Sequence, residues 1–455
     1  MVPRRPGEVR ATWVVIGAGS AGCVAAARLS EDDDRDVVLL EAGPDLAPGS
    51  VPAAVDGANF LAALELDGRT FPDLTARRTR SGPATPYRRG RGVGGSSVVN
   101  AMVALRGSAG QYERWGWDDV DVAWRAVAVP VEVPGRDEFG PVDVALLAAC
   151  PDARPAPLTR RDRRRVTAAE AYLWPAIGRP NLTVRPGAVV DRVEVEGRRA
   201  VGVVLADGEH VPADRVVLAA GALHTPAILL RSGCDTPGLG DGLQDHPSIP
   251  LTLRLRPGVD QDADGLVIGA ICQRDGVQFL PMNHLGADAP GFAALSVALM
   301  TPRGRDGFVR PAGDDPQLDP IVEFALLADD RDLRALRTGL EHARSLLRTA
   351  PFAEIVDEVY VDDRGTTLDA VGEPTDSWVR SRVGDYVHAS STCAMGAVVD
   401  DDGAVRGYEA LFVCDASVFP SIPDVNTHLP TMMLAERLTR RWRRADGRRT
   451  AGVAR

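Results

Sequence analysis

The chain has 455 residues, which is long enough for one elaborate α/β unit or for two domains with substantial cores. Hydrophobic residues make up 45% of the sequence and charged residues 25%, ordinary values that argue against global disorder. The 52 Lys and Arg residues are outnumbered by 63 Asp and Glu residues, for a formal net charge of −11. Because phosphate binding needs a basic field, we expect no nucleic-acid partner.

Cysteine usage and hydropathy bear on the compartment. The six cysteines include no CxxC pair and are too dispersed for a disulfide framework or a thiolate zinc site. We therefore expect buried free thiols and no bound metal. No apolar stretch approaches the roughly 18–20 residues that a membrane span needs, and the first apolar run, 13–16, is too short for a secretory signal. The sequence predicts a cytoplasmic protein without a membrane span.

A βαβ unit is predicted at the N-terminus. Residues 12–17 form an apolar run stopped by glycine, as in a buried parallel strand, and the alanine-rich stretch 21–29 predicts a helix. Residues 37–40 predict a second buried strand that ends at Glu41. The turn between the first strand and the helix is Gly17-Ala18-Gly19-Ser20-Ala21-Gly22, a GxGxxG motif.

Each glycine of this motif suits a dinucleotide. Gly17 permits a tight turn, Gly19 lets the backbone approach a pyrophosphate, and Gly22 lets the helix pack closely on the strand. The N-terminus of the helix then faces the phosphate charge. Glu41 follows Gly22 by about 20 residues, where a carboxylate can accept hydrogen bonds from ribose hydroxyls. The unit therefore predicts dinucleotide binding.

A second glycine-rich stretch, 89–100, supplies two serine hydroxyls and a run of backbone N–H groups. It suits a loop against an anion or a cofactor, and taken alone it also suits a flexible linker. Residues 134–165 are rich in Pro and Arg, show little periodicity and predict an irregular surface segment. Further strands are predicted at 182–184, 189–195, 200–205, 216–221 and 411–414, and helices at 333–347, capped by Asp329 or Asp330, and at 431–443.

Taken together, several motifs resemble the glucose–methanol–choline (GMC) family of FAD-dependent oxidoreductases over nearly the whole chain. The matching segments are the FAD fingerprint Gly17–Gly22 with 41–43, the first signature 90–107, the second signature 219–233, the GxxLxDHP element 240–247, and the catalytic block 388–396 with 415–431. The resemblance implies an α/β fold, with a discontinuous Rossmann-type FAD-binding domain and an interleaved α+β substrate domain built on an antiparallel sheet.

The expected boundaries follow from the same resemblance. The FAD-binding domain would comprise 1–110, 186–245 and 376–445, and the substrate-binding domain 111–185 and 246–375, with a tail at 446–455.

The resemblance also assigns cofactor contacts. The ADP half of FAD would be held by Gly17, Gly19, Ser20, Ala21, Gly22, Glu41 and Ala42, with the adenine against the backbone of Val190. The flavin side would be lined by Gly92, Gly95, Asn100, Ala101, Met102 and Val103, the ribityl–pyrophosphate portion by Asp415 and Ala416, and the pyrimidine edge by Thr427. Covalent members of the family carry a histidine immediately before the signature asparagine. Val99 stands there, so we expect noncovalent FAD.

Two histidines are the expected catalytic residues. His388 matches the active-site histidine of the family, and His428 falls where the family places Asn or His. One imidazole would take the hydroxyl proton of the substrate while hydride leaves its carbon for the flavin N5 atom, and the other would hydrogen-bond the alcohol oxygen. An unperturbed pKa of about 6.5 suits this role. We expect His224 and His246 to serve structure, and the remaining three histidines to lie at the surface or in packing positions.

The implied reaction is oxidation of a small-molecule alcohol to an aldehyde or ketone, by a dehydrogenase in preference to an oxidase. The electron acceptor would be a quinone, a redox cofactor or dioxygen. The chain is short between Trp117 and Val166, where the family builds the wall over the flavin, so we expect an open site. In its length the chain is similar to mycofactocin-associated members. Two alternatives stay open: an FAD-containing hydroxynitrile lyase with a redox-silent flavin, and a nicotinamide-dependent reductase using the fingerprint alone.

Overall fold

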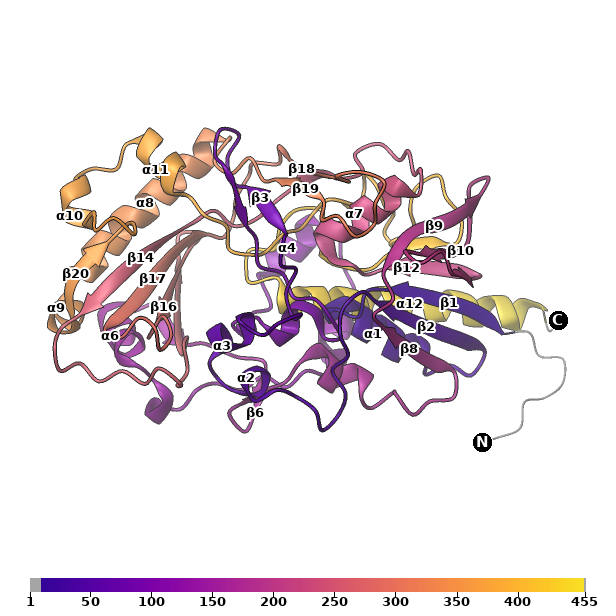
Figure 1. Cartoon of the computed structure of the whole chain (residues 1–455), viewed down its shortest axis with the longest axis horizontal. Coiled ribbons are helices and arrows are strands. Elements are labelled where there is room, and N and C mark those ends of the chain that lie inside the picture. The colour runs from indigo at the N-terminus through magenta and orange to yellow at the C-terminus, as the bar shows by residue number, and fades with distance from the viewer. Residues whose placement is uncertain (1–9, 454–455) are drawn as a thin grey trace.

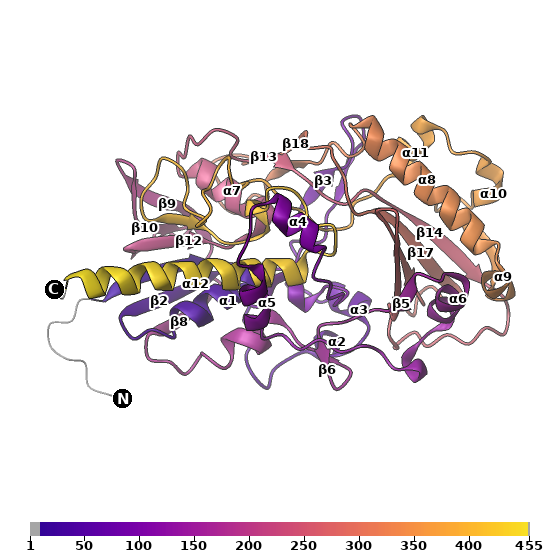
Figure 2. The ribbon, with the colours of Figure 1, turned by 180° about the vertical axis from the view of Figure 1, so that it is seen from behind.

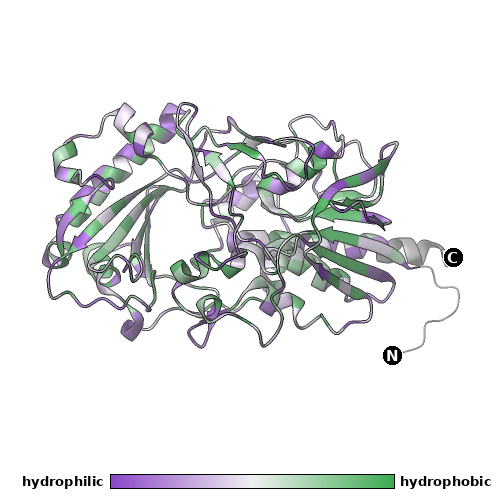
Figure 3. Ribbon diagram, in the orientation of Figure 1, coloured by the Kyte–Doolittle hydropathy of each residue, from purple (hydrophilic) through white to green (hydrophobic). Residues whose placement is uncertain are grey.

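The computed structural model describes residues 10–453, with side chains to residue 446. Two sheets lie at opposite ends of an elongated molecule (Figure 1). A parallel sheet occupies the end near both termini, and an antiparallel sheet occupies the other. Hydrophobic residues concentrate on the strands of both sheets (Figure 3). This arrangement confirms the expected α/β fold with an interleaved antiparallel domain.

The parallel sheet contains five strands in the order β21-β12-β1-β2-β8. Its members are β1 (Ala11–Ile16), β2 (Arg35–Glu41), β8 (Leu182–Pro186), β12 (Arg215–Leu218) and β21 (Leu411–Val413). Every pairing is parallel. The central strands are apolar because both faces of the sheet are covered. The N-terminal βαβ unit is confirmed.

Two helices pack side by side against this sheet, the short α1 (Ser20–Leu29) and the long α12 (His428–Val453) (Figure 2). Trp13 of β1 meets Trp442 of α12 with ring centroids 5.8 Å apart. The first and last helices therefore share one core, and the N-terminus of α12 lies against the fingerprint loop. The last helix is longer than the predicted 431–443.

A three-stranded antiparallel sheet covers β12, formed by β9 (Val190–Glu196), β10 (Arg199–Leu205) and β11 (His210–Pro212). Strand β12 leads into α7 (Gly221–Arg231). The predicted strands at 189–195 and 200–205 are thereby confirmed, and the strand predicted at 216–221 is present but ends at Leu218.

The antiparallel sheet of the other end has the order β20-β14-β17-β16-β15-β5. Its strands are β5 (Ala153–Pro155), β14 (Ser248–Leu255), β15 (Ala270–Arg274), β16 (Val277–Met282), β17 (Phe292–Leu299) and β20 (Val356–Tyr360). One face packs against α6 (Pro141–Ala149) and α8 (Asp330–Leu347). Asp329 caps α8 by accepting from the Arg331 N–H.

Side chains alternate between the two faces of these strands, so the other face of the sheet points toward the centre of the molecule. Val277 and Phe279 of β16 face the helices, whereas Leu280 and Met282 face a cavity between the two ends. Ser296 of β17 also lines that cavity. Because side chains alternate along a strand, this face of the sheet places a layer of side chains over the cavity.

A five-stranded sheet joins the two ends, in the order β13-β18-β19-β3-β4. Its strands are β3 (Thr75–Arg77), β4 (Ala84–Pro86), β13 (Asp241–Leu243), β18 (Gly307–Arg310) and β19 (Ile321–Glu323). The smaller elements are α2 (Ala53–Asp56), α3 (Phe60–Leu64), α4 (Ala109–Arg114), α5 (Val120–Ala126), β6 (Arg160–Arg161), β7 (Arg164–Arg165), α9 (Ala350–Ile355), α10 (Leu368–Val371) and α11 (Asp376–Arg382).

Two predictions need correction. Residues 134–165 are not an irregular surface segment, because α6 buries Val142 and Leu146 against the antiparallel sheet. The boundary at 186 is also too late, since β8 pairs with β2 and so belongs to the nucleotide-type sheet. The helices α4 and α5 of the predicted substrate segment likewise pack in the core of the parallel sheet, through Tyr112 and Trp124.

Candidate active site

A cavity of about 710 Å³ lies between the parallel and antiparallel sheets. It runs from Val190 and Ser20 at the nucleotide end to His388 at the other. Both predicted catalytic histidines line it, and so do all the predicted cofactor residues except Gly22 and Gly92. The structure therefore gathers into one place residues that the sequence spreads over some 400 positions.

At the fingerprint, the three glycines meet different surroundings. Gly17 has φ +97°, and a Cβ there would lie 2.6 Å from the Ala219 oxygen. A Cβ on Gly22 would lie 1.8 Å from the Gly17 oxygen, so only glycine allows the helix this close to the strand. A Cβ on Gly19 would meet no protein atom within 4 Å. The backbone at Gly19 is therefore open to the cavity, as close approach by a pyrophosphate requires.

Glu41 joins the two glycine-rich loops. One carboxylate oxygen accepts from the Ala18 N–H at 2.8 Å, and the other accepts from the N–H groups of Gly43 and Gly92, each at 2.9 Å. Three of its lone pairs are thus used by backbone donors, and its role in the loop geometry was not foreseen. Gly92 contributes through this contact and not by lining the cavity.

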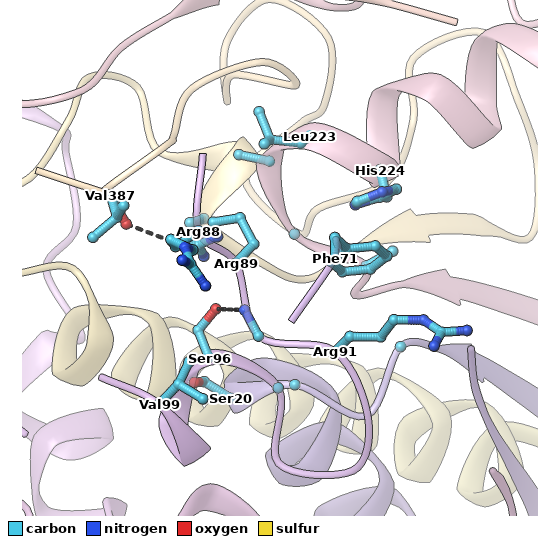
Figure 4. Close-up of a pocket in the computed structure, with 18 of the residues that line it drawn as sticks. Ser20, Phe71, Arg88, Arg89, Arg91, Ser96, Val99, Leu223, His224 and Val387 are labelled. Atoms are coloured by element: carbon cyan, nitrogen blue, oxygen red, sulfur yellow. Dashed lines mark hydrogen bonds between the residues drawn. The ribbon is translucent and has the colours of Figure 1, made fainter. Parts of the chain in front are cut away.

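The second glycine-rich stretch is an ordered part of the wall. The Gly94 N–H donates to the Ala18 oxygen at 2.8 Å, and a Cβ on Gly95 would lie 2.6 Å from the Gly19 Cα. The Ser96 hydroxyl accepts from the Gly90 N–H at 3.1 Å (Figure 4). The loop therefore packs on the fingerprint, and the flexible-linker interpretation is wrong.

A buried arginine supports the same loop. Arg165 donates to the backbone oxygen and side-chain oxygen of Asn100, at 2.6 and 2.7 Å, and to the Val55 oxygen at 2.9 Å. No carboxylate is among its hydrogen-bond partners in the described chain, and burial lowers its pKa to about 9. Arg165 places Asn100 at the cavity wall. No local pattern signals this contact, because Arg165 stands in a run of arginines.

The backbone around His388 is fixed by one buried carboxylate. Asp245 accepts from the N–H groups of His246, Tyr386 and His388, at 2.7, 3.2 and 3.0 Å, and from the Tyr87 hydroxyl at 2.7 Å. Burial, and then the charge of nearby Asp385, raise the pKa of Asp245 to about 7. The donors hold Val387 at φ +54°, an uncommon conformation for a β-branched residue. The turn carrying His388 is therefore built for one geometry.

The His388 ring has a histidine partner. Its Nδ1 lies 2.9 Å from Nδ1 of His246, and the two rings are at 89°. Nε2 of His246 lies 2.9 Å from the Pro423 backbone oxygen. Burial lowers the pKa of His246 to about 4. Burial, and then the field of His246, lower the pKa of His388 well below its ordinary value.

Asp245, His246 and His388 also bring three potential metal-ligand atoms within 4.8 Å of one another. In the described structure those groups are already engaged. The carboxylate has four donors, His246 uses both ring nitrogens, and His388 uses Nδ1. The arrangement is a hydrogen-bond network.

His428 makes its hydrogen bond to the fingerprint loop and not to this network. Its Nδ1 is 3.0 Å from the Ser20 hydroxyl of the fingerprint, and its Nε2 is buried without a partner among the described residues. Burial, and then the charge of Arg165, lower its pKa to about 4. The structure thus ties His428 to the nucleotide loop, whereas the sequence analysis assigned it to the substrate.

Two residues earlier, Asn426 lines the cavity with a buried Oδ1 that has no partner in the described chain. The sequence analysis missed this residue, although it stands in the same motif as Thr427. Nearby, Asp415 accepts from the Thr225 hydroxyl at 2.6 Å and from the Gly221 and Ser417 N–H groups. Asp415 thereby joins the end of β21 to the start of α7.

The rim of the cavity is basic and aromatic. Phe71 stacks on His224 with ring centroids 4.3 Å apart (Figure 4). The arginines 88, 89 and 91 come after β4 in the chain and line the same cavity. The Arg89 guanidinium donates to the Val387 oxygen, next to His388. In the described chain, no lining residue comes from 104–187. The segment that was expected to be thin therefore contributes nothing to the cavity wall.

Comparison with known families decides the assignment. Models of the GMC oxidoreductase family match residues 11–153, 153–248 and 302–435. The chain belongs to the GMC oxidoreductase family. It is an FAD-dependent oxidoreductase that acts on alcohols, and its cavity fits the cofactor. The backbone at Gly19 is open to the cavity, and Asn426 and His428 line it.

Relatives of this GMC oxidoreductase span nearly all of it. A GMC-type oxidoreductase of Rhodococcus erythropolis is 32% identical over 94% of this chain and 97% of that protein. An oxygen-dependent choline dehydrogenase of Paraburkholderia phytofirmans is 32% identical over 94% and 93%. The crystal structure of pyridoxine 4-oxidase from Mesorbium loti has a TM-score of 0.85 at 26% identity, covering 96% of this chain and 99% of that one.

The first of these alignments extends over 501 positions, more than the 455 residues of this chain, so the relative carries insertions that this enzyme lacks. Within residues 10–453, no helix is long and apolar enough to cross a membrane.

Proposed function

We propose that this enzyme oxidises the CH–OH group of a small-molecule alcohol with His388 as the general base. The observation that carries the proposal is the His388 turn, in which a buried carboxylate and a second imidazole hold one ring at the cavity wall. A positioned base of this kind contributes about 10²–10⁴-fold to a rate. Because burial keeps the pKa of His388 low, the ring is unprotonated and ready to accept at neutral pH.

Bound FAD supplies the hydride acceptor at flavin N5. The substrate hydroxyl donates its proton to His388 while the C–H bond breaks, so the alcohol loses one proton and one hydride and becomes an aldehyde or ketone. The face formed by Leu280, Met282 and Ser296 offers a mostly apolar surface to the carbon skeleton. Choline and pyridoxine, named for two relatives, both present a hydroxymethyl or hydroxyethyl group, and a primary alcohol is the substrate class that we propose.

We assign the second contact to the alcohol oxygen to Asn426 and not to His428. Asn426 lines the cavity, and its Nδ2–H2 group can donate to the alcohol oxygen, whose own proton goes to His388. His428 is engaged by Ser20 of the fingerprint and has its free Nε2 buried, which suits a contact to the cofactor.

Noncovalent cofactor binding is part of the proposal, since Val99 offers no nucleophile. For the acceptor, we favour a dehydrogenase that passes electrons to a quinone or a redox peptide cofactor. In the described chain, residues 104–187 add nothing to the cavity wall, which supports access by an acceptor larger than dioxygen.

The test is anaerobic bleaching of the yellow holoenzyme by a panel of primary alcohols that includes choline, pyridoxine and benzylic alcohols. At least one should reduce the flavin, and acid should release all FAD into the supernatant. Reoxidation is then timed with air, a quinone and a dye; rapid reoxidation by air alone would make the enzyme an oxidase. A flavin that no alcohol reduces would contradict the proposed reaction and favour a redox-silent role.

A further inference from the structure

His246 is fully buried and has a hydrogen-bond partner at each ring nitrogen. On one side stands the Pro423 backbone oxygen, and on the other Nδ1 of His388, each at 2.9 Å. The two distances together restrict where the protons can lie.

A carbonyl oxygen can only accept a hydrogen bond, so Nε2 of His246 must carry a hydrogen and donate it to Pro423. A neutral imidazole has one N–H, which leaves Nδ1 of His246 with a lone pair. Nδ1 of His388 must then be the donor across the 2.9 Å contact. His388 is left with a lone pair on Nε2, the nitrogen that has no partner in this network.

Both rings are neutral at physiological pH, because burial depresses the pKa of each. With one proton per ring, the contacts have a single consistent arrangement, in which donation runs from His388 through His246 to the Pro423 oxygen. The opposite tautomer of His388 would place two lone pairs against each other at 2.9 Å.

We propose that His246 is a positioning residue that, together with the Pro423 carbonyl, fixes His388 in the tautomer with its proton on Nδ1 and its lone pair on Nε2. The inference rests on the proposed role of His388 as the base. During the reaction the O–H bond of the alcohol breaks and an Nε2–H bond forms on His388, while the His388 Nδ1–H continues to donate to His246. No proton has to move along the chain.

The choice of a neutral acceptor has a chemical consequence. In a Ser-His-Asp triad a carboxylate accepts the Nδ1–H and stabilises the imidazolium strongly. Here the acceptor is an uncharged imidazole, and the nearby carboxylate of Asp245 is directed to backbone N–H groups instead. The base is oriented as in a triad but is not made more basic by a charge, so it can release its proton after the turnover.

The direct test measures the tautomers in the holoenzyme. Protein labelled with ¹⁵N-histidine is examined by long-range ¹H–¹⁵N correlation, and the two residues are assigned by loss of their signals in His388→Gln and His246→Asn. We expect a protonated Nδ1 and a bare Nε2 for His388, and the reverse for His246. A protonated Nε2 on His388 overturns the proposal. The measurement needs no substrate, so it stands even if the enzyme oxidises no alcohol in the panel.

Two variants test the consequence for rate. His246→Leu removes the acceptor, whereas His246→Asn can offer an amide oxygen near the position of Nδ1. We expect anaerobic flavin reduction to slow by about 10- to 100-fold in His246→Leu, a part of what a positioned base contributes, with substrate Kd little changed. His246→Asn should restore most of the rate.

The matched control is His210→Leu, at an exposed histidine of β11, which should keep the wild-type rate. FAD content and absorbance establish that each variant is folded. A wild-type rate in His246→Leu, or an Asn variant as slow as the Leu variant, overturns the positioning role. If the wild-type enzyme is reduced by an alcohol but the tautomer is reversed, the inference fails while the proposed function stands.

Discussion

The fingerprint end of the cavity is bounded mainly by backbone, whereas the His388 end is bounded by buried ionisable side chains. At the first, glycines and main-chain N–H groups pack at distances that exclude a Cβ, and the buried carboxylate of Glu41 is used to hold backbone. At the second, Asp245, His246 and His388 are linked to one another. A binding surface made of backbone is disrupted by added side-chain bulk. A site made of titratable groups loses activity when those groups change protonation or orientation. The two ends should therefore respond to different perturbations.

The largest effect is expected at Gly22. A methyl group there would lie 1.8 Å from the Gly17 oxygen, so Gly22→Ala should cost more than the ~1–3 kcal/mol of ordinary overpacking and prevent folding of the parallel-sheet end. Gly19→Ala should leave the apoprotein as stable as wild type and weaken only FAD binding, because the methyl group points into open space. Urea unfolding of apoproteins and the FAD-to-protein absorbance ratio separate the two. Equal apoprotein stability for Gly22→Ala and wild type would contradict this view.

At the other end, His388→Ala should keep both the fold and FAD while flavin reduction slows by about 10²–10⁴-fold. The lost interaction develops as the hydroxyl proton departs, so the reduction rate should suffer more than substrate affinity. Stopped-flow bleaching under anaerobic conditions is the measurement. A near-normal rate would show that another group is the base.

Asn426 and His428 stand two residues apart in one motif but should respond differently to truncation. Asn426→Ala should slow flavin reduction by about 10- to 100-fold, the loss of a hydrogen bond of roughly 1.5–3 kcal/mol, with FAD affinity unchanged. His428→Ala should weaken FAD binding, measured by flavin fluorescence on dilution, and change the reduction rate less at saturating FAD. The reverse pattern would restore His428 to the substrate.

The smallest effect is expected on the pH profile. His388 must be unprotonated to act, so activity is present above its pKa and lost as pH falls through it. Because burial and the field of His246 hold that pKa well below the ordinary value, the reduction rate should still be flat at pH 6.5, where a solvated imidazole is half protonated. The groups that face this ring and also titrate or carry charge are Asp245, His246, Tyr87, Tyr386, Asp385 and Arg89.

Asp245 has a pKa near 7, so its titration is the one that could be mistaken for that of the base. An inflection near pH 7 that disappears in Asp245→Asn would belong to the carboxyl group, whereas the limb due to His388 should remain at lower pH. A half-maximal rate at pH 6.5 in both proteins would refute the burial argument.

Prediction from sequence succeeded where the signal is local. The βαβ unit, the strands before Gly221 and Cys414 and the cap at Asp329 all depend on a few neighbouring residues. The antiparallel sheet was anticipated through the family resemblance, but helix α6 was missed because its nine residues fall among Pro and Arg and gain stability only by packing on that sheet.

The network at His388 escaped prediction for a related reason. His246 meets a ring 142 residues away and a carbonyl 177 residues away, and neither distance leaves a trace in local periodicity. His428 was assigned to the substrate from its motif alone. A motif does not show whether a given side chain contacts the substrate or, like that of His428, the fingerprint loop.

The hydrogen bond between Ser20 and His428 joins residues 408 positions apart and has a consequence for biosynthesis. At about 5–20 residues per second, a ribosome needs roughly 20–80 s to travel from one to the other. Throughout that time the fingerprint loop exists without α12, the helix that covers α1 and completes the cradle. Loading with FAD is therefore a late, post-translational event, and the nascent chain must keep the apolar face of α1 from aggregating until its C-terminal partner emerges.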